Sequence, residues 1–210
     1  MMRSDNMSLM PLMIDMQNKH VVIIGGGKVA ERRVHKFIDF TSHIRIISPE
    51  LTPNLNELYQ DSVIEWIQKK FESSEDIAQA DLIIVATNDE ATNQHILKVK
   101  PPHALINMAG EASQGNVIVP NILRRGHLTI SITTNGASPG LTSQLLSEFE
   151  QRFPTSYESY VDFLYECRTK VKNSSLSSTE KQNILKALLD ETYLDTKKQK
   201  EIKIWLDSIN

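Results

Sequence analysis

The sequence predicts an α/β fold with three parts: an N-terminal parallel sheet, a small strand-rich region and a C-terminal α-helical domain. Three observations predict it. Short apolar runs without strict alternation recur between helix-like segments in the first half of the chain, as in a parallel sheet covered on both faces. A glycine-rich turn joins one of these runs directly to a helix. Beyond residue 138, apolar residues recur only at helical spacing.

The elements of the sheet follow in order along the first half of the chain. A short leading strand is expected at 12–15, and core strands at 20–24, 44–48, 63–67, 81–87 and 104–108. Helical segments are expected at 28–38, 76–80 and 92–99. Prolines mark two of the ends, because Pro49 follows the second core strand and Pro101 follows the third helical segment.

A strand-rich region is expected after Gly110. Strands at 116–120 and 127–134 flank the segment 121–126, and the second alternates between apolar and polar residues. Such a pair of strands either extends the sheet or pairs with a second subunit. Both possibilities stay open at this point.

The C-terminal part is expected to be helical. Ser138 is a suitable N-cap, and Pro139 occupies the first helical position after it. Ser177 and Glu180 have the spacing of a capping box. The expected domains are residues 1–113, 114–137 and 138–210.

Composition narrows the class of protein. The 210 residues are 40% hydrophobic and 23% charged, which is ordinary for a soluble globular protein. The formal net charge of −3 argues against a protein that binds nucleic acid by bulk electrostatics. No apolar run is long enough for a membrane span, and no apolar signal segment opens the chain. The single cysteine, Cys167, excludes an internal disulfide and favours the cytoplasm.

The glycine turn has the spacing of a dinucleotide site. Gly25, Gly27 and Ala30 fit the pattern G-x-G-x-x-G/A between a strand and a helix. The helix N-terminus offers free N–H groups and a positive dipole end to phosphates. The residues expected to hold the pyrophosphate are Gly25, Gly26, Gly27, Lys28, Val29 and Ala30. A turn needed only for strand-to-helix geometry is the alternative, and Lys28 is equally well explained as a solvated lysine.

The ends of the other strands supply further candidates for cofactor binding. The second strand ends in Ser48, Pro49 and Glu50, where an acidic residue often binds the ribose and where no basic residue stands to accept a 2′-phosphate. Glu50 is also explained as a plain exposed carboxylate. Thr87 and Asn88 follow the fourth core strand and are suited to hydrogen bonds with ribose or nicotinamide, or to starting the next helix.

Four motifs in this order resemble one known family. They are the glycine turn at 25–32, the segment Ala-Thr-Asn-Asp-Glu-Ala-Thr-Asn-Gln at 86–94, Pro-Asn-Ile at 120–122 and Ser-Pro at 138–139. The set is similar to the precorrin-2 dehydrogenase family, the stand-alone form of the N-terminal module of siroheme synthase. The resemblance covers the chain from about residue 11 to the helical tail.

The resemblance implies the dehydrogenation of precorrin-2 to sirohydrochlorin with NAD, a step towards siroheme. It implies a Rossmann-type domain, a small dimerisation region and a helical domain, assembled as a homodimer that binds a tetrapyrrole. One alternative is a bifunctional enzyme that also inserts Fe²⁺ into sirohydrochlorin. An alternative from another class is a non-catalytic protein that senses a dinucleotide.

The end of the fifth core strand departs from the family pattern. Asn107 is expected beside the nicotinamide, as a candidate for both catalysis and cofactor binding. The family has an aspartate three residues later that is assigned to catalysis. This chain has Gly110 at that position and Glu111 one residue further on. Glu111 is therefore the candidate catalytic carboxylate only if the loop turns, because adjacent residues of an extended chain point apart.

The carboxylates of a tetrapyrrole predict cationic groups in its pocket. Arg124 and Arg125 lie between the two expected strands of the small region, and each is also explained as part of a solvated turn. Thr134 and Asn135 lie in a loop that faces the active site in the family, with loop shaping as the alternative role. The histidines do not have the spacing of metal ligands, so no metal site is predicted.

Overall fold

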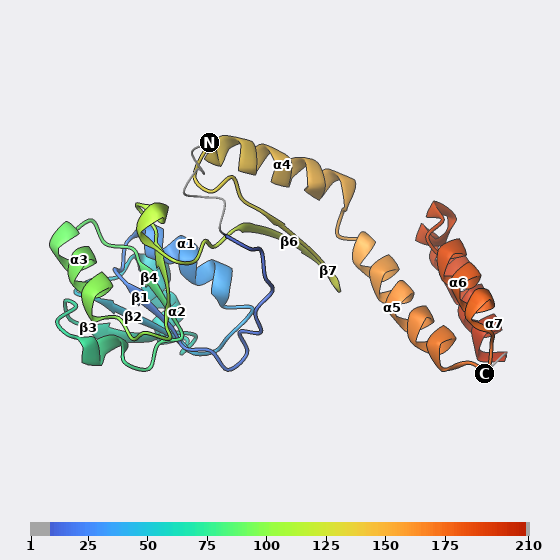
Figure 1. Cartoon of the computed structure of the whole chain (residues 1–210), viewed down its shortest axis with the longest axis horizontal. Helices are drawn as coiled ribbons and strands as arrows, with labels where there is room; N and C mark the ends of the chain where they lie inside the picture. The colour runs from blue at the N-terminus through green and yellow to red at the C-terminus, as the bar shows by residue number, and fades with distance from the viewer. Residues whose placement is uncertain (1–8, 209–210) are drawn as a thin grey trace, which may run out of the picture. The chain divides into compact units, whose positions relative to one another are not determined.

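The computed structural model of this chain describes residues 9–208. It contains two compact units, Met1–Val119 and Pro120–Asn210, whose helices and strands are labelled in Figure 1. The first unit has the α/β architecture that the sequence predicts, and the second combines a strand pair with helices.

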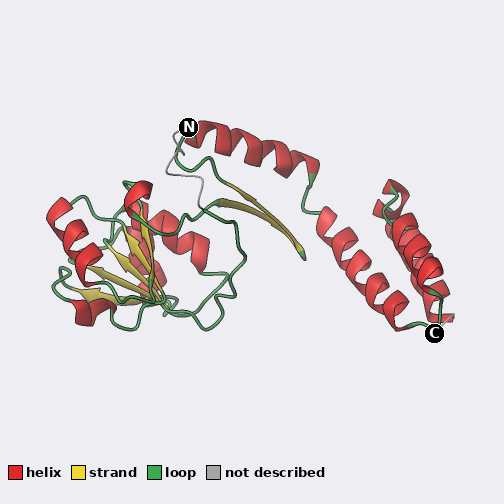
Figure 2. Ribbon diagram, viewed as in Figure 1, coloured by secondary structure: helices red, strands yellow, loops and turns green. Residues whose placement is uncertain are grey.

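A five-stranded parallel sheet forms the centre of the first unit (Figure 2). Its strands run in the spatial order β3-β2-β1-β4-β5. Their bounds are β1 Val21–Ile24, β2 Ile44–Ser48, β3 Glu65–Gln68, β4 Leu82–Val85 and β5 Leu105–Met108. Val21 pairs with Ile44 on one side and with Leu82 on the other, so β1 is the central strand.

Apolar side chains from successive strand residues enter two separate cores, because neighbouring residues of a strand point to opposite faces. One core joins Val21 and Ile23 to α1 (Lys28–Phe37) and α2 (Pro53–Gln60). The other joins Val22 and Ile24 to η1 (Ser74–Ile77) and α3 (Glu90–Val99). Burial on both faces explains why the strands are continuous apolar runs.

The outer edge of β5 is covered by an irregular segment. The short helix η2 (Ala112–Gln114) follows β5, and the backbone N–H groups of Asn116 and Val117 then donate to the carbonyl oxygen of Ile106. The Oδ1 of Asn116 accepts from the N–H of Ile106 at 2.7 Å. This segment therefore satisfies backbone groups that a further strand would otherwise pair.

The second unit begins with an antiparallel hairpin. Strands β6 (Asn121–Arg125) and β7 (Leu128–Ile132) form a two-stranded sheet of their own. Gly126 makes the tight turn at a φ of 56°, a backbone conformation that favours glycine. The helix α4 (Pro139–Arg152) follows, and Ser138 caps it by accepting from the N–H of Leu141 at 3.2 Å.

The remaining helices of the second unit have their own core. They are α5 (Tyr157–Asn173), α6 (Ser178–Ala187), η3 (Glu191–Leu194) and α7 (Thr196–Ser208). Phe163, Leu188 and Leu206 are buried together there. Cys167 is buried in the same cluster, and desolvation raises the pKa of its thiol to about 11. Cys167 is therefore a packing residue, as its position on an apolar helix face indicates.

Three expectations about the elements were wrong or incomplete. Residues 12–15 form no strand, because both neighbours of β1 are already strands and no sheet edge is free beside it. The strand expected at 116–120 lies instead at Asn121–Arg125, since 116–117 bond to β5 and Pro120 cannot donate to a ladder. Helix α2 was not predicted, although Thr52 and Pro53 are a suitable N-cap and first residue.

Candidate functional site

The carboxyl ends of the parallel strands gather the residues predicted to bind a dinucleotide. They lie in the turns after β1, β2 and β4 and in β5 itself. The order of the strands reverses between β1 and β4, and ligands of open α/β sheets bind at such a switch point. The first unit thus brings the cofactor candidates to one edge of one sheet.

Gly25 and Gly26 allow the turns at this edge to pack on one another. A Cβ atom on Gly25, whose φ is 114°, would lie 2.4 Å from the carbonyl oxygen of Ala86 after β4. A Cβ on Gly26 would lie 1.9 Å from the carbonyl oxygen of Glu50 after β2. Both glycines are therefore required by the contacts between backbones, before any ligand is considered.

Gly27 differs from its two neighbours. A Cβ at this position would meet nothing within 4 Å among the described atoms of the protein. Gly27 is also the N-cap of α1, and no side chain of residues 9–208 caps that helix end. The N–H groups of Lys28, Val29 and Ala30 belong to the first turn, which has no carbonyl one turn earlier to accept from them. The helix thus presents free donors beside an open space.

The side chain of Lys28 is held by Glu31 in the first turn of α1. The Nζ of Lys28 lies 3.1 Å from both carboxylate oxygens of Glu31. Glu31 also accepts from the hydroxyl of Thr52, the N-cap of α2, at 2.5 Å. This hydrogen bond from Thr52, followed by the one from Lys28, lowers the pKa of Glu31. A carboxylate charge thus stands between the starts of two helices.

The turn after β2 is fixed from several sides. Ser48 is buried and donates its hydroxyl hydrogen to the carbonyl oxygen of Glu50 at 2.8 Å, so its hydroxyl serves the turn itself. From β3, the indole N–H of Trp66 donates to the carbonyl oxygen of Ser48 at 3.0 Å. Pro49 and the side chain of Glu50 are exposed. Contact of these three residues with a ribose stays a prediction.

The turn after β4 starts helix α3 through Asp89. Its carboxylate accepts from the N–H of Ala91 at 3.1 Å and from the hydroxyl of Thr92 at 2.6 Å. The hydrogen bond from Thr92 is the main reason that the pKa of Asp89 is lowered. The hydroxyl oxygen of Thr87 accepts from the N–H of Asp89, which leaves its hydrogen for another acceptor. Asn88 is exposed and does not cap the helix.

Asn107 in β5 has an acceptor atom without a partner. Its side chain is only 3% exposed, and its Nδ2 donates to the carbonyl oxygen of Val117 at 3.0 Å. Within the described part of the chain, its Oδ1 is buried and accepts no hydrogen bond. An unpaired buried acceptor costs about 1–3 kcal/mol, so a donor that reached it would be stabilising.

Glu111 lies in the loop after β5 and is held by neighbours. Its carboxylate accepts from the side-chain amide of Gln114 at 2.7 Å, and Gln114 in turn accepts from Gln94 of α3 at 3.1 Å. Gly110 is exposed, with open space where a side chain would be. The loop therefore turns Glu111 towards η2, and a catalytic role for Glu111 stays a prediction.

The four residues predicted to bind substrate lie in the second unit. Arg125 donates from Nε to the carbonyl oxygen of Phe153 at 2.8 Å, which ties β6 to the end of α4. The hydroxyl oxygen of Thr134 accepts from the N–H of Ser138 at 3.0 Å, and Asn135 adopts a left-handed conformation with a φ of 53°. Arg124 is exposed. These contacts give Arg125 and Thr134 structural roles, while binding of a substrate stays a prediction for all four.

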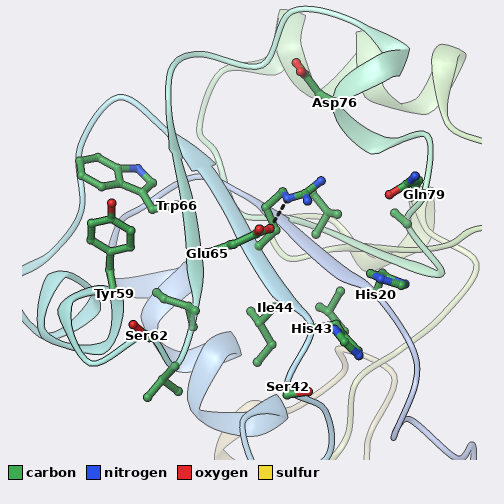
Figure 3. Close-up of a pocket in the computed structure, with 16 residues that line it drawn as sticks. His20, Ser42, His43, Ile44, Tyr59, Ser62, Glu65, Trp66, Asp76 and Gln79 are labelled. Atoms are coloured by element: carbon green, nitrogen blue, oxygen red, sulfur yellow. Dashed lines mark hydrogen bonds and ion pairs between the residues drawn. The ribbon is translucent and has the colours of Figure 1, made fainter.

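A pocket of about 570 Å³ lies at the opposite edge of the sheet (Figure 3). Its walls include His20 and His43, which precede β1 and β2 and whose rings stack with centroids 4.8 Å apart. Arg45 and Glu65 form an ion pair of 2.7 Å within it. None of the predicted site residues lines this pocket, which lies at the amino ends of the strands.

Comparison with known proteins decides the family. Residues 12–121 match the family described as "Putative NAD(P)-binding", and residues 157–202 match the "SirC C-terminal domain". The precorrin-2 dehydrogenase of Priestia megaterium is 33% identical over 191 residues, which span 90% of this chain and 94% of that protein. This chain belongs to the precorrin-2 dehydrogenase family. The precorrin-2 dehydrogenase of Bacillus subtilis is 35% identical over 162 residues, or 77% of this chain and 99% of that protein.

Two further relatives define the extent of the match. A solved structure named SirC, precorrin-2 dehydrogenase, superposes with a TM-score of 0.81 at 30% identity and covers 95% of this chain and all of that one. The siroheme synthase of Actinobacillus pleuropneumoniae is 27% identical over 87% of this chain but only 37% of its own length. The precorrin-2 dehydrogenase family thus accounts for the fold of most of the chain.

Sequence reasoning missed two residues at the carboxyl edge of the sheet in this member of the precorrin-2 dehydrogenase family. Glu31 and Thr52 lie 21 residues apart, and no spacing rule joins them. The signal that was available is the pair Thr52-Pro53, which marks a helix start directly after the second strand. A predicted helix there would have placed its N-cap beside the glycine turn.

Among residues 9–208, no helix is both long enough and apolar enough to cross a membrane.

Proposed function

We propose that this chain catalyses the dehydrogenation of precorrin-2 to sirohydrochlorin in siroheme biosynthesis, with NAD as the hydride acceptor. The observation that carries the proposal is the open, uncapped start of α1 at Gly27. It lies at the switch point of the sheet, in a chain that matches a precorrin-2 dehydrogenase over 90% of its length. The non-catalytic sensor is not favoured, because the matched relatives carry the names of enzymes.

The residues at the carboxyl edge fit a nicotinamide dinucleotide. The free N–H groups of Lys28, Val29 and Ala30 are suited to the pyrophosphate, beside the space that Gly27 leaves open. The buried Oδ1 of Asn107 is suited to the carboxamide N–H of the nicotinamide. Bound there, the cofactor supplies a carbon that accepts hydride. The side chain of Thr87 retains a hydroxyl hydrogen with which to orient a ribose or carboxamide oxygen.

The chain's own contribution to the chemistry is mainly positioning. The dehydrogenation removes a hydride and a proton from an electron-rich macrocycle. General-base catalysis contributes about 10²–10⁴-fold, whereas holding two reactants in the right geometry contributes more. Gly110 stands where the family has a carboxylate, and Glu111 is hydrogen-bonded to Gln114. Dehydrogenation therefore proceeds without a dedicated base at position 110.

Metal insertion is not part of the proposal. Placing Fe²⁺ in sirohydrochlorin requires the removal of two pyrrole N–H protons, so it depends on a base more than dehydrogenation does. The absence of a carboxylate side chain at Gly110 therefore weakens chelation more than oxidation. The bifunctional alternative remains testable by adding the metal after the oxidation is complete.

NAD is proposed rather than NADP because the turn after β2 has no cation for a 2′-phosphate. Residues 48–50 are serine, proline and glutamate. Lys28, the cation that directly follows the glycine turn, is paired with Glu31. A 2′-phosphate placed at this turn would therefore meet carboxylates rather than a basic side chain.

A homodimer in the cytoplasm completes the proposal. In residues 120–152, Leu123 and Thr142 are the buried side chains, and the apolar core of the second unit lies in α5–α7. A two-stranded sheet is marginally stable without further packing, so a second copy is the proposed cover for β6, β7 and α4. The single, buried Cys167 accords with a reducing compartment.

An anaerobic assay with purified chain tests this function. Precorrin-2 and NAD⁺ are expected to yield the absorption spectrum of sirohydrochlorin, and NADP⁺ is expected to support a much slower reaction. Addition of Fe²⁺ after completion is expected to leave the rate of siroheme formation at the value measured without protein. A folded protein that leaves precorrin-2 unchanged would refute the proposal, and a protein-dependent rate with Fe²⁺ would establish the bifunctional enzyme instead.

A further inference from the structure

Many dinucleotide sites have a carboxylate at the end of the second strand that binds the ribose. In this chain no carboxylate is held in place at the end of β2. The strand ends in Ser48, which is 2% exposed and donates to the carbonyl oxygen of Glu50. The carboxylate of Glu50 is exposed, and within residues 9–208 no hydrogen bond or ion pair holds its side chain. An exposed carboxylate without a partner is strongly screened by water and salt, so it discriminates only weakly against a second anion.

The carboxylate of Glu31, by contrast, is fixed at the same corner. It accepts from the hydroxyl of Thr52 at 2.5 Å, and its side chain is 16% exposed. Thr52 is anchored in turn, because its N–H donates to the carbonyl oxygen of Gly26 at 3.0 Å and its hydroxyl oxygen accepts from the N–H of Leu55. The charge of Glu31 therefore lies beside both the glycine turn and the start of α2.

The charge of Glu31 is only partly compensated. Lys28 reaches both of its oxygens, but the lysine side chain is 76% exposed, so water screens its charge well. The same pairing keeps the ammonium of Lys28 away from any phosphate nearby. Glu31 thus both repels an added anion and pairs with the ammonium of Lys28.

We propose that Glu31, held by Thr52, is a specificity-determining residue that selects NAD over NADP by opposing the 2′-phosphate at the β2–α2 corner. This inference rests on the proposed function, since it assumes that a nicotinamide dinucleotide binds at Gly27. It assigns to the first turn of α1 the discrimination that other dinucleotide sites place at the end of the second strand. Electrostatic repulsion of this kind excludes the wrong ligand without adding a contact to the right one.

Calorimetric titration of four proteins with NAD⁺ and with NADP⁺ tests the assignment. The proteins are the wild type, Glu31→Gln, Glu50→Gln and Glu57→Gln. Glu50→Gln tests the alternative that the carboxylate after β2 sets the preference. Glu57→Gln is the matched control, because it changes an exposed carboxylate on α2 away from this corner. Glu31→Gln keeps an acceptor for Thr52 but removes the charge and releases Lys28. We expect it to tighten NADP⁺ binding about tenfold while changing the Kd of NAD⁺ less than about threefold.

Salt distinguishes a charge effect from a structural one. In the wild type, raising KCl from about 50 mM to 500 mM is expected to reduce the preference for NAD⁺, because screening weakens the repulsion. In Glu31→Gln the preference is expected to depend much less on salt. Glu31→Asp, which retains the charge, is expected to retain the preference. Lys28→Met, at an exposed position, is expected to increase it because the carboxylate is then uncompensated.

Three outcomes overturn the inference. They are an unchanged NAD⁺ to NADP⁺ ratio in folded Glu31→Gln, a shift of that ratio by Glu50→Gln instead, and an unchanged ratio in Lys28→Met should Glu31→Gln fail to fold. Failure of the proposed function has a different signature, because the wild type would then bind neither nucleotide.

Discussion

Gly25, Gly26 and Gly27 are three identical residues with different constraints. Gly25 and Gly26 face backbone oxygens of neighbouring turns, whereas Gly27 faces open space. The motif spacing predicts Gly25 and Gly27 from sequence, because it encodes the turn and the approach of a ligand. The requirement for Gly26 was not predictable, since it depends on how the turn after β2 packs over the turn after β1.

This difference predicts that alanine at Gly27 lowers the affinity for NAD⁺, whereas alanine at Gly26 lowers the stability of the fold. Gly27→Ala is expected to fold with a stability within about 1 kcal/mol of the wild type, since its φ of −88° suits any residue. Its methyl group fills the space above the helix start, so the Kd of NAD⁺ is expected to rise at least about tenfold. Gly26→Ala is expected to lose about 1–3 kcal/mol or more of stability through overlap with Glu50.

Thermal unfolding and calorimetry measure the two effects separately. Gly26→Ala is the control for general damage to the turn. Equal NAD⁺ affinity in the wild type and in folded Gly27→Ala would contradict the placement of the pyrophosphate at this helix end.

Asn107 and Glu111 show how far single residues were predictable. Asn107 was placed by counting to the end of a strand, and the structure adds a buried oxygen without a partner. The direction of Glu111 was not predictable, because it depends on Gln114 and, through it, on Gln94 from a different helix. Contacts between distant segments carry no periodic signal in the sequence.

Asp81 predicts a dependence of stability on pH. The N–H of His20 and then the ammonium of Lys19 hold its carboxylate, and they lower its pKa below the ordinary value of 3.8. A lowered folded pKa means that the stabilisation is complete above 3.8 and is lost as pH falls through the folded value. Asp81→Asn is expected to cost about 1 kcal/mol or less at pH 7, given the partial exposure.

The measurement is the difference in Tm between the wild type and Asp81→Asn. It is expected to be constant from pH 7 to pH 5 and to shrink at lower pH. A difference that grows as the solution becomes more acidic would show that the carboxylate is not stabilised by these donors.

Elements with a strong local signal were predicted well. The five strands of the sheet and helices α1, α3, α4 and α6 lie where apolar spacing and capping residues place them. The hairpin was displaced because residues 116–120 are apolar for another reason, namely packing against β5. Periodicity alone does not distinguish a strand from an extended segment that covers a sheet edge.

Helix α6 offers a test of the capping signal. The hydroxyl of Ser177 accepts from the N–H of Glu180, and the carboxylate of Glu180 accepts from the N–H of Ser177 at 2.9 Å. Ser177→Ala is therefore expected to cost about 1 kcal/mol, measured by chemical unfolding. Ser178→Ala, one residue further on, is the matched control and is expected to change stability by less than about 0.5 kcal/mol. Equal losses in both variants would contradict the capping role.

At the scale of the whole molecule, the sequence predicts an α/β domain, a small strand-rich region and a C-terminal helical domain. The two compact units meet at Val119 and Pro120, between the segment that covers β5 and the first strand of the hairpin. The boundary lies there because residues 116–119 pack beside β5 and not in the hairpin. Composition does not show which of the two strands they join. Assembly of two copies stays a proposal, and the sparse burial in β6, β7 and α4 is the structural feature that supports it.

The stoichiometry of the reaction tests the central claim most directly. Purified chain, precorrin-2 and NAD⁺ are mixed without oxygen, and NADH and sirohydrochlorin are quantified in the same sample. The account predicts one NADH for each sirohydrochlorin formed, with both products falling together in Gly27→Ala. Formation of sirohydrochlorin without NADH, or no product from folded wild-type protein that binds NAD⁺, would contradict it.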